Sequence, residues 1–598
     1  MSPRDAAANM VIERDLQITM DDGLVLRADV YRPKTDAPVP VIMTLGPYGK
    51  GVMYQDHYKA MWDWLIAQHP DLLPGSSRSF MAWETVDPET WVPWGYAVVR
   101  VDSRGACRSP GMLDIFSPRE TLDYYHAIEW AGTRRWSNGK VGLNGISYYA
   151  INQWHVAQLQ PPHLAAMVPW EGAADMYRDW YRHGGILSNK FMEVWYPRQV
   201  LQVQHGNPQA PRDHWMSESA AGPEQLSPGE LAANRVDNLT NARAREMDDE
   251  WYRNQSPDWS KVRVPFLSAA NWAGFGLHPR GNFEAFAQAA SKQKWLEGHP
   301  GRHEEWFYVP YGMALQKRFF DHFLKGEQNG WDKEPRVWVN LRRPFSKEFE
   351  LRKEDAWPLE GTRWTRLFLD AGNGSLDWRA PAREGAATFA AHSAGVTCMS
   401  PPLERETEIT GPMALKLYVS SSTVDADLFV TVQAFSPDAR EVEFQGTIDP
   451  HTPLAQGWLR ASHRKLDQVR SLPYRPYHMH DDKRPLTPGQ VYELDVEVWP
   501  MCIVLPAGFR IAVNIAGRDF ERPGTDDPKL PFPARGSGPW MHNDRYDRPT
   551  DIFAGNTTLH TGSGREAYLL LPVIPADRPG VRTTKPVTHN GKDGQIAR

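Results

Sequence analysis

Runs of apolar residues in the first half of the chain follow two patterns. Residues 22–32 alternate between apolar and polar, with Leu24, Leu26, Ala28 and Val30 on one face, as expected of a half-buried antiparallel strand. The later runs are short and dominated by apolar residues, which is typical of strands covered on both faces. They occupy residues 39–46, 96–102, 140–147, 164–172 and 264–272. We therefore predict a sheet that begins antiparallel and continues as a parallel sheet.

Helical patterns separate several of these strands, most clearly at residues 119–132, where apolar residues recur at helical spacing. Alternation of strands and helices predicts a parallel sheet with crossover helices. The alternation stops between about 176 and 261, where segments rich in Trp, Tyr, Arg and Asp include a helix start at Ser227-Pro228. We interpret this stretch as a helical cap inserted into the sheet domain.

After a helical run at residues 311–327, the pattern changes to alternating strands separated by Pro, Gly and Asp. The clearest strands occupy residues 413–421, 427–435, 491–500 and 509–517. In the third of them, acidic side chains fall on one face and apolar side chains on the other, which indicates a β-sandwich. The closing stretch, residues 583–598, is polar and is expected to be loosely ordered.

Length, charge and cysteine usage narrow the class of protein. A chain of 598 residues is too long for one hydrophobic core, so two or three domains are expected. A net charge of -6 without a long basic run argues against a nucleic-acid partner. Cys107, Cys398 and Cys502 lie far apart and form neither a disulfide framework nor a metal motif. Because no signal segment or long apolar span is visible, we expect a cytoplasmic protein without a membrane partner.

The strongest chemical feature is the stretch GLNGISYYA at residues 142–150, where an apolar strand turns through small residues into a helix-like segment. A serine on such an elbow projects its hydroxyl above the sheet, and the next helix offers backbone N–H groups to an oxyanion. We therefore predict that Ser147 is a nucleophile. The usual elbow is G-x-S-x-G, and Tyr149 replaces its last glycine, so the motif alone is also compatible with a structural serine.

This region resembles the CocE/NonD family of α/β-hydrolases, which includes cocaine esterase, X-prolyl dipeptidyl peptidases, glutaryl acylases and α-amino-acid ester hydrolases. The family elbow reads G-x-S-Y followed by a small residue two positions on, as in Gly145 to Ala150. The D-x-R-G-x-x-x-S-x-G loop at residues 102–111 and a helix ending in FLKG extend the resemblance over nearly the whole chain. Together with the strand pattern, it predicts an α/β-hydrolase catalytic domain over residues 10–175 and 262–350, a cap over 176–261, and a jelly-roll-like C-terminal β-sandwich over 351–590.

The resemblance also implies an oxyanion hole. The family carries a tyrosine whose hydroxyl donates to the oxyanion, and Tyr48 in the segment LGPYGK matches it. A phenol can serve because it is a neutral donor at pH 7. With the backbone N–H of Tyr148, Tyr48 would complete a two-donor hole. The alternative is that Tyr48 is a packed aromatic residue.

A serine nucleophile needs a histidine as base and a carboxylate that fixes the imidazole tautomer. In this fold the base lies in the loop after the last parallel strand, where the chain has both His299 and His303. The family typically has a G-P-W-x-H stretch here, and aligning Gly298 with its glycine places His303 near the histidine with one inserted residue. We predict His303 as the base, with His299 as the alternative.

The acid is where the chain departs from the family. Many relatives read G-W-Y-D after the preceding strand, whereas this chain reads N-W-A-G at residues 271–274 and has Gly274 at the aspartate position. Some α/β-hydrolases take the acid from the end of an earlier strand, and Glu171 ends such a strand. We predict Glu171, with Glu297, Asp175 or no functioning acid as alternatives.

A purely structural role for Glu171 would instead pair it with a cap arginine, Arg178 or Arg182. The predicted reaction is attack by Ser147 on a small-molecule ester or activated amide, and it requires no metal or organic cofactor. X-prolyl dipeptidyl-peptidase or acylase activity is the alternative within the family. From another class, a catalytically silent binding protein is possible, because fold alone does not decide function. A cap rich in Trp and Tyr suits a bulky apolar or aromatic substrate, and a homo-oligomer is possible.

Overall fold

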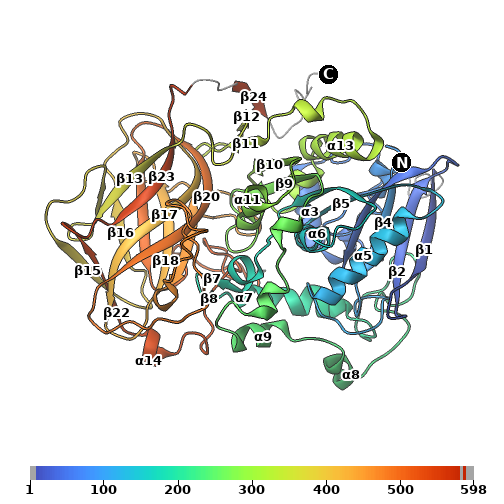
Figure 1. Cartoon of the computed structure of the whole chain (residues 1–598), viewed down its shortest axis with the longest axis horizontal. Helices are drawn as coiled ribbons and strands as arrows, with labels where there is room; N and C mark the ends of the chain where they lie inside the picture. The colour runs from blue at the N-terminus through green and yellow to red at the C-terminus, as the bar shows by residue number, and fades with distance from the viewer. Residues whose placement is uncertain (1–8, 529, 579–582, 588–598) are drawn as a thin grey trace.

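The structure is a computed structural model that describes residues 9–528, 530–578 and 583–587. It has an α/β part, which holds the N-terminal half of the chain, and an all-β part beside it (Figure 1). The α/β part is built on an eleven-stranded sheet with the order β1-β2-β4-β3-β5-β6-β9-β10-β11-β12-β24. The strands are β1 (Met10–Thr19), β2 (Val25–Pro33), β3 (Val39–Gly46), β4 (Ala97–Asp102), β5 (Ser137–Ile146), β6 (Leu164–Trp170), β9 (Phe266–Asn271), β10 (Lys294–His299), β11 (Val337–Leu341), β12 (Phe349–Glu354) and β24 (Thr583–Val587).

This sheet is antiparallel at its margins and parallel in its centre. Strand β2 pairs antiparallel with β1 and β4, and the strands from β4 through β3, β5, β6, β9 and β10 to β11 are parallel, as the apolar patterns predict. Helices α5 (Pro118–Gly132), α6 (Tyr148–Ala157) and α11 (Pro279–Gln288) pack on one face, and α13 (Pro310–Lys325) packs on the other. The carboxyl ends of the central strands therefore meet at one edge, where ligands bind in open α/β sheets.

The all-β part closes on itself. Its sheet has the order β15-β22-β17-β20-β19-β18-β21-β16-β14-β13-β23, and an additional pairing of β17 with β23 joins nine of the strands into a ring. The ring encloses a core of aliphatic side chains and confirms the predicted C-terminal β-sandwich-like domain. The strands are β13 (Arg363–Asp370), β14 (Ser375–Asp377), β15 (Gly385–Ala390), β16 (Val396–Met399), β17 (Thr407–Ser421), β18 (Asp427–Phe435), β19 (Ala455–Arg460), β20 (Tyr492–Leu505), β21 (Arg510–Ala516), β22 (Asn556–Thr561) and β23 (Tyr568–Ile574).

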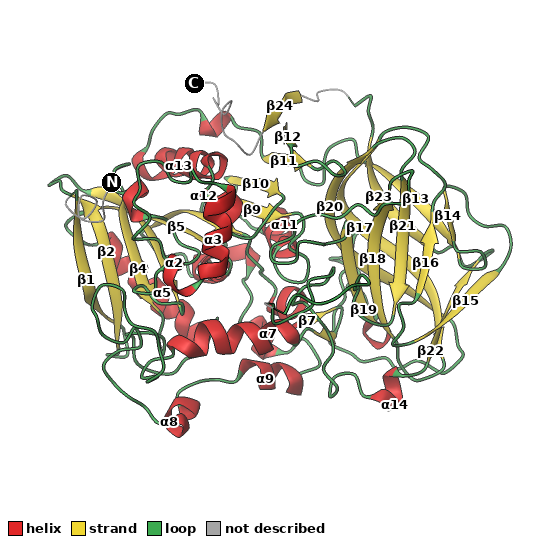
Figure 2. Cartoon of the chain, turned by 180° about the vertical axis from the view of Figure 1, so that it is seen from behind, coloured by secondary structure: helices red, strands yellow, loops and turns green. Residues whose placement is uncertain are grey.

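Short helices between β6 and β9 form the cap, which lies below the central sheet and reaches the all-β part through β7 (Figure 2). At the predicted helix start, the Ser227 hydroxyl accepts from the Glu230 N–H and the Glu230 carboxylate accepts from the Ser227 N–H. The cap elements are η1 (Met176–Tyr181), β7 (Arg182–His183), β8 (Ile186–Leu187), α7 (Lys190–Trp195), η2 (Tyr196–Val200), η3 (Leu201–Val203), α8 (Pro228–Ala233), α9 (Asn238–Ala244), α10 (Glu250–Arg253) and η4 (Trp259–Lys261). The remaining helices are α2 (Tyr54–His57), α3 (Lys59–Gln68), α4 (Pro88–Trp91), α12 (Glu305–Tyr308), η5 (Trp331–Lys333), η6 (Ala461–His463) and α14 (Thr550–Phe553).

The end of the chain returns to the α/β part. Strand β24 pairs antiparallel with β12 at the edge of the first sheet, so the expectation of a loosely ordered closing stretch is wrong for residues 583–587. Its remainder, residues 588–598, lies outside the described residues. Strand β24 and residues 351–354 of β12 lie beyond the predicted domain boundary at residue 350, yet they belong to the first sheet. A division at residue 350 therefore does not follow the sheets. No helix in the described residues is long and apolar enough to cross a membrane.

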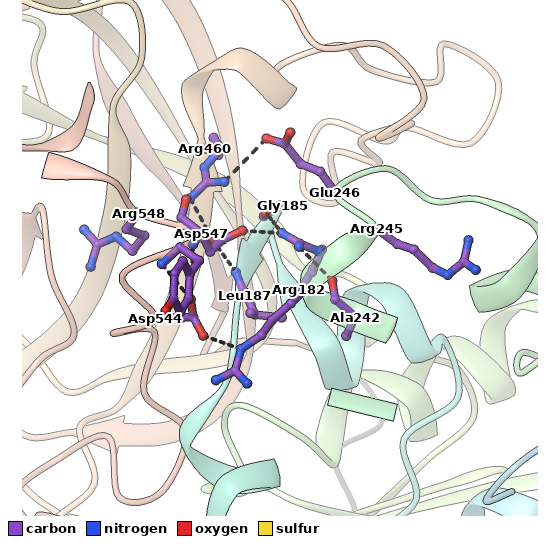
Figure 3. Close-up of polar contacts among 12 residues, drawn as sticks. Arg182, Gly185, Leu187, Ala242, Arg245, Glu246, Arg460, Asp544, Asp547 and Arg548 are labelled. Carbon is purple, nitrogen blue, oxygen red and sulfur yellow. Dashed lines mark hydrogen bonds and ion pairs between the residues drawn. The ribbon is translucent and has the colours of Figure 1, made fainter. Parts of the chain in front are cut away.

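A buried ion-pair network joins the cap to the all-β part (Figure 3). Asp547 accepts from Arg182 of the cap at 2.7 Å and from Arg460 of β19 at 2.8 Å. Its second oxygen also accepts from the backbone N–H of Leu187 at 3.1 Å. Burial would raise the pKa of Asp547, but Arg460 and Arg182 outweigh it and hold that pKa well below the usual range. The carboxylate therefore stabilises the docked arrangement only while it is ionised.

Replacing Asp547 with Ala should leave two buried guanidinium groups without this partner. Breaking a buried pair on one side costs about 3–5 kcal/mol, and we expect a loss of that order in urea denaturation followed by tryptophan fluorescence. The folded pKa lies below the unfolded value of about 3.9. The contribution is thus fully present above that value and is lost as the pH falls through the folded pKa, so the two proteins should converge in acid. Equal loss in Asp551→Ala, at an exposed aspartate of α14, would contradict the assignment.

Candidate active site

The turn after β5 has the geometry of a nucleophile elbow. Ser147 adopts φ 56° and ψ -113° between the last strand residue, Ile146, and Tyr148, which begins α6. A positive φ is costly for a residue with a side chain and recurs at catalytic turns. The Ser147 N–H donates to the Trp170 carbonyl of β6 at 3.0 Å, which fixes the elbow to the neighbouring strand. The Ser147 side chain is thus held at the carboxyl edge of the sheet, with 7% of its surface exposed.

The unusual Tyr149 of this elbow has a steric explanation. A Cβ atom at Gly46, on the adjacent strand β3, would lie 2.5 Å from the Tyr149 ring, so the missing side chain at Gly46 makes room for that ring. Gly145 remains essential, because a Cβ atom there would lie 2.5 Å from the Tyr149 Cβ. The space that the last glycine of a G-x-S-x-G elbow would leave is provided here by Gly46 of the neighbouring strand.

His303, in the loop after β10, lies between two carboxylates. Its Nδ1 is 2.7 Å from an oxygen of Glu171, and its Nε2 is 3.0 Å from an oxygen of Glu84. The ring also stacks on His278, with 4.8 Å between ring centroids. Burial would lower the pKa of His303, but Glu171 and Glu84 raise it to about 10. Among the described residues, the Ser147 hydroxyl has no hydrogen-bond partner.

Glu171 directly follows β6 and is fully buried. One oxygen binds His303, and the other accepts from the Asn271 amide at 3.0 Å and lies 3.0 Å from His299 Nε2. Burial would raise the pKa of Glu171, but His303 and His299 lower it to about 2. Glu171 is therefore an ionised carboxylate at neutral pH, held at the end of the strand where the sequence predicts it.

The alternative histidine and one alternative acid form a separate pair. His299 is completely buried, with Nδ1 2.7 Å from a Glu297 oxygen and Nε2 facing Glu171. Both ring nitrogens of His299 are thus occupied by carboxylates within the sheet edge. Glu297 reaches His299 and the Asn340 amide, and among the described contacts it does not bind His303.

Asp175 and the cap arginines have other partners. Asp175 accepts the Arg178 N–H at the start of η1 and pairs with the same guanidinium at 2.8 Å. Arg178 also binds Asp248, and Arg182 binds Asp547. In the described part of the chain, neither arginine pairs with Glu171, so the structural ion pair considered for that residue is not formed.

Tyr48 lies beside the elbow, where its ring packs edge-on against Tyr148 at 5.7 Å. Its hydroxyl oxygen accepts from the Trp195 indole N–H at 3.0 Å, which leaves the phenolic hydrogen available for another acceptor. Burial raises the pKa of Tyr48 well above its usual value, so the phenol is neutral. The Tyr148 side chain turns away and donates to Glu120 at 2.7 Å, and only its backbone N–H remains at the elbow.

Aromatic side chains from the cap and the all-β part surround this edge. Phe191 stacks on Trp195, with 5.5 Å between centroids, and also contacts Trp540, at 4.4 Å. Trp540, which belongs to the C-terminal half of the chain, packs edge-on against His278 at 6.3 Å. The surroundings of the candidate site are thus built by all three parts of the molecule.

Glu84 is one of the residues at this site that sequence reasoning missed. It lies in an irregular segment between α3 and α4, where no strand or helix periodicity marks it. It is 3% exposed and reaches His303 across the elbow. The sequence signal is weak, because a single acidic residue in a long loop is most often a solvated one.

One group of side chains could in principle hold a metal ion. Among the described residues, Glu171, His278 and His303 present ligand atoms within 4.8 Å of one another. However, Glu171 and His303 already engage each other in a direct hydrogen bond, and both nitrogens of His303 face carboxylates. We therefore assign no metal to this group.

Comparisons with known proteins match both the α/β part and the all-β part of the chain. The X-Pro dipeptidyl-peptidase (S15 family) model matches residues 22–305, and the model of the X-Pro dipeptidyl-peptidase C-terminal non-catalytic domain matches residues 329–570. A solved CocE/NonD family hydrolase from Staphylococcus aureus is 32% identical, covers 94% of each chain and superposes with a TM-score of 0.80. The chain belongs to the CocE/NonD hydrolase family. It is therefore a serine hydrolase of ester or amide bonds, which confirms the predicted family, fold class and enzyme class.

Three further relatives have lower sequence identity to this chain. Cocaine esterase from Rhodococcus sp. is 23% identical over 95% of this chain and 99% of its own length. A putative serine esterase from Mycobacterium tuberculosis is 24% identical over 89% of this chain and 94% of its own. An α-amino acid ester hydrolase of 16% identity superposes with a TM-score of 0.67, which shows the shared fold alone.

Proposed function

We propose that this CocE/NonD hydrolase is a carboxylesterase-like enzyme in which Ser147 attacks an ester or activated amide carbonyl. The observation that carries the proposal is the 2.7 Å contact between His303 and the buried, ionised Glu171 at the same sheet edge as the Ser147 elbow. Serine, histidine and carboxylate in that relation support nucleophilic catalysis through an acyl-enzyme.

In the proposed triad, His303 accepts the Ser147 proton and later returns it to the leaving group. Glu171 accepts from Nδ1, which fixes the tautomer that leaves Nε2 for this exchange, and it stabilises the imidazolium once formed. The acyl-enzyme is then hydrolysed by water, with His303 again taking the proton. The chain order serine, acid, histidine is that of α/β-hydrolases.

The proposed oxyanion hole consists of the Tyr48 hydroxyl and the Tyr148 backbone N–H. The Trp195 indole N–H occupies an acceptor site of the Tyr48 oxygen and so aims the phenolic hydrogen elsewhere. Neutral donors in a buried site stabilise developing negative charge more strongly than the same donors in water. Burial and the raised pKa of Tyr48 support this role.

For the substrate we propose a small ester with an apolar or aromatic group, which suits the ring-lined surroundings formed by Phe191, Trp195 and Trp540. Relatives named as Xaa-Pro dipeptidyl-peptidases make peptide cleavage the second candidate. We place the enzyme in the cytoplasm, since its three cysteines are buried and free.

Substituting Ser147 with Ala should abolish covalent labelling by a fluorophosphonate probe and lower turnover of a small aryl ester at least about 10⁴-fold, because the attacking oxygen is lost. Labelling is read by in-gel fluorescence on folded protein. A wild type that neither reacts with the probe nor turns over aryl esters would support the silent binding protein instead.

Changing Glu171 to Gln should lower kcat about 10³–10⁴-fold with little change in KM, because a neutral amide does not stabilise the imidazolium. The matched control is Glu297→Gln, which alters a buried carboxylate that binds His299 and not His303. Steady-state kinetics on both variants decide the acid, and equal losses in the two would show that Glu171 was wrongly chosen.

Removing the Tyr48 hydroxyl with Phe keeps the ring packing and should lower kcat about 10²–10³-fold, the usual effect of losing one oxyanion donor. KM should change little, since the donor acts on charge that develops in the transition state. The competing view of Tyr48 as a packed aromatic residue predicts near wild-type kcat for this variant.

A further inference from the structure

The segment that carries Glu84 is fixed to the nucleophile strand. The Glu84 carbonyl accepts from the Ile146 N–H at 3.1 Å, and Thr85 pairs with Gly145 in an isolated antiparallel bridge. Tyr308 donates to the Thr85 carbonyl at 2.8 Å. Glu84 itself has φ 62°, a left-handed conformation that is costly for a non-glycine residue and is found at sites where geometry is tightly determined. Its carboxylate is therefore held over the elbow by its own backbone.

The two carboxylates that face His303 determine where its protons lie. Nδ1 is 2.7 Å from Glu171 and Nε2 is 3.0 Å from Glu84, and a hydrogen bond needs one proton between each pair of atoms. Either the imidazolium donates to both carboxylates, or a neutral imidazole accepts from a protonated Glu84. In both forms one proton lies between Nε2 and Glu84, so the Nε2 lone pair is not free for Ser147.

We propose that Glu84 is a positioning residue that holds this proton against Nε2 of His303 and keeps the base away from Ser147 in the free enzyme. The base becomes available when the shared proton leaves and the Glu84 side chain, now an acceptor facing the Nε2 lone pair, turns aside. The inference rests on the proposed function, since it concerns His303 as the base of Ser147.

The pKa values of the ionisable groups around His303 and Glu84 are consistent with a proton shared between the two. Burial raises the pKa of Glu84 to about 7, with His303 opposing and the carboxylates of Glu171 and Glu304 adding to the rise. Burial lowers the pKa of His278, stacked on the His303 ring, to about 3, so this ring is neutral. The surrounding phenols also have raised pKa values and are neutral; they are Tyr48, Tyr58, Tyr149 and Tyr308.

A second observation is that only one of the two carboxylate oxygens of Glu84 forms a hydrogen bond among the described residues. Its other oxygen, Oε2, is buried and has no hydrogen-bond partner among the residues that the structure describes. A buried ionised carboxylate normally accepts several hydrogen bonds, and leaving one oxygen bare favours the protonated form or a shared proton. The same loop thus supplies a carboxylate that is fixed at one oxygen by His303 and left bare at the other.

The expected pH dependence follows from the sign of these effects. His303 binds its extra proton more tightly because two carboxylates face it, so the free enzyme gains reactivity as the pH rises and that proton is lost. The acidic limb of kcat/KM reports this loss, because kcat/KM follows the ionisation of the free enzyme. Neutralising Glu84 removes one of the two anions, and His303 then releases the proton at lower pH.

The test is Glu84→Gln, followed from about pH 5 to about pH 10 by kcat/KM for a small aryl ester and by the rate of fluorophosphonate labelling. The acidic limb should move to lower pH by at least about one unit, a tenfold change in proton affinity. A merely structural role would change the amplitude of the profile and leave the limb in place. An unmoved limb in the folded variant overturns the proposal.

Two further variants keep the test decisive. The control Glu89→Gln neutralises a carboxylate that lies five residues after Glu84 and binds Ser77. The acidic limb of this variant should match that of the wild type. If Glu84→Gln does not fold, Glu84→Asp shortens the reach to Nε2 and should shift the limb in the same direction, while a wild-type limb there overturns the proposal. Wild type that is never labelled refutes Ser147 as the nucleophile, whereas labelled protein with unmoved limbs refutes only the role of Glu84.

Discussion

The contact between Glu171 and His303 is the interaction on which the arrangement of the site depends. A carboxylate buried at the end of β6 is stable as an anion only if donors surround it. Glu171 obtains them from both histidines of the β10 end and from the Asn271 amide of β9. Three neighbouring strands are therefore tied together at their carboxyl edge by one negative charge, beside the strand that carries Ser147.

This geometry allows the proposed triad to form without an aspartate at Gly274. In the strand order β5-β6-β9-β10, the position after β9 and the position after β6 both lie beside the loop that follows β10. A carboxylate can therefore reach the same imidazole from either side. Here the β9 end supplies an amide, Asn271, which donates to Glu171 and to the Gly301 carbonyl and so holds acid and loop together. In the proposed triad the acid therefore follows β6 instead of β9, and β9 supports it through the Asn271 amide.

The sequence predicted those features that are set by local pattern and by strand order. Apolar runs located the central strands, and the elbow around Ser147 and the strand end at Glu171 followed because the ends of parallel strands meet. Glu84 could not be found in this way, since its place depends on a left-handed backbone in an irregular loop and on a pairing with Gly145. Trp540 was equally hidden, because only the docking of the all-β part brings it beside His278.

The docking of the all-β part therefore bears on the proposed oxyanion hole as well as on the stability of the chain. Asp547 links Arg182 of the cap to Arg460 of β19, and the cap strand that carries Arg182 lies between η1 and α7. Trp195 of α7 donates to Tyr48, and Phe191 of the same helix packs on Trp540. A shift of the all-β part would move α7 through the contact between Phe191 and Trp540. Trp195 would move with α7 and change the direction of the Tyr48 hydroxyl. The orientation of Tyr48, the proposed oxyanion donor after β3, thus depends on ion pairs formed several hundred residues later in the chain.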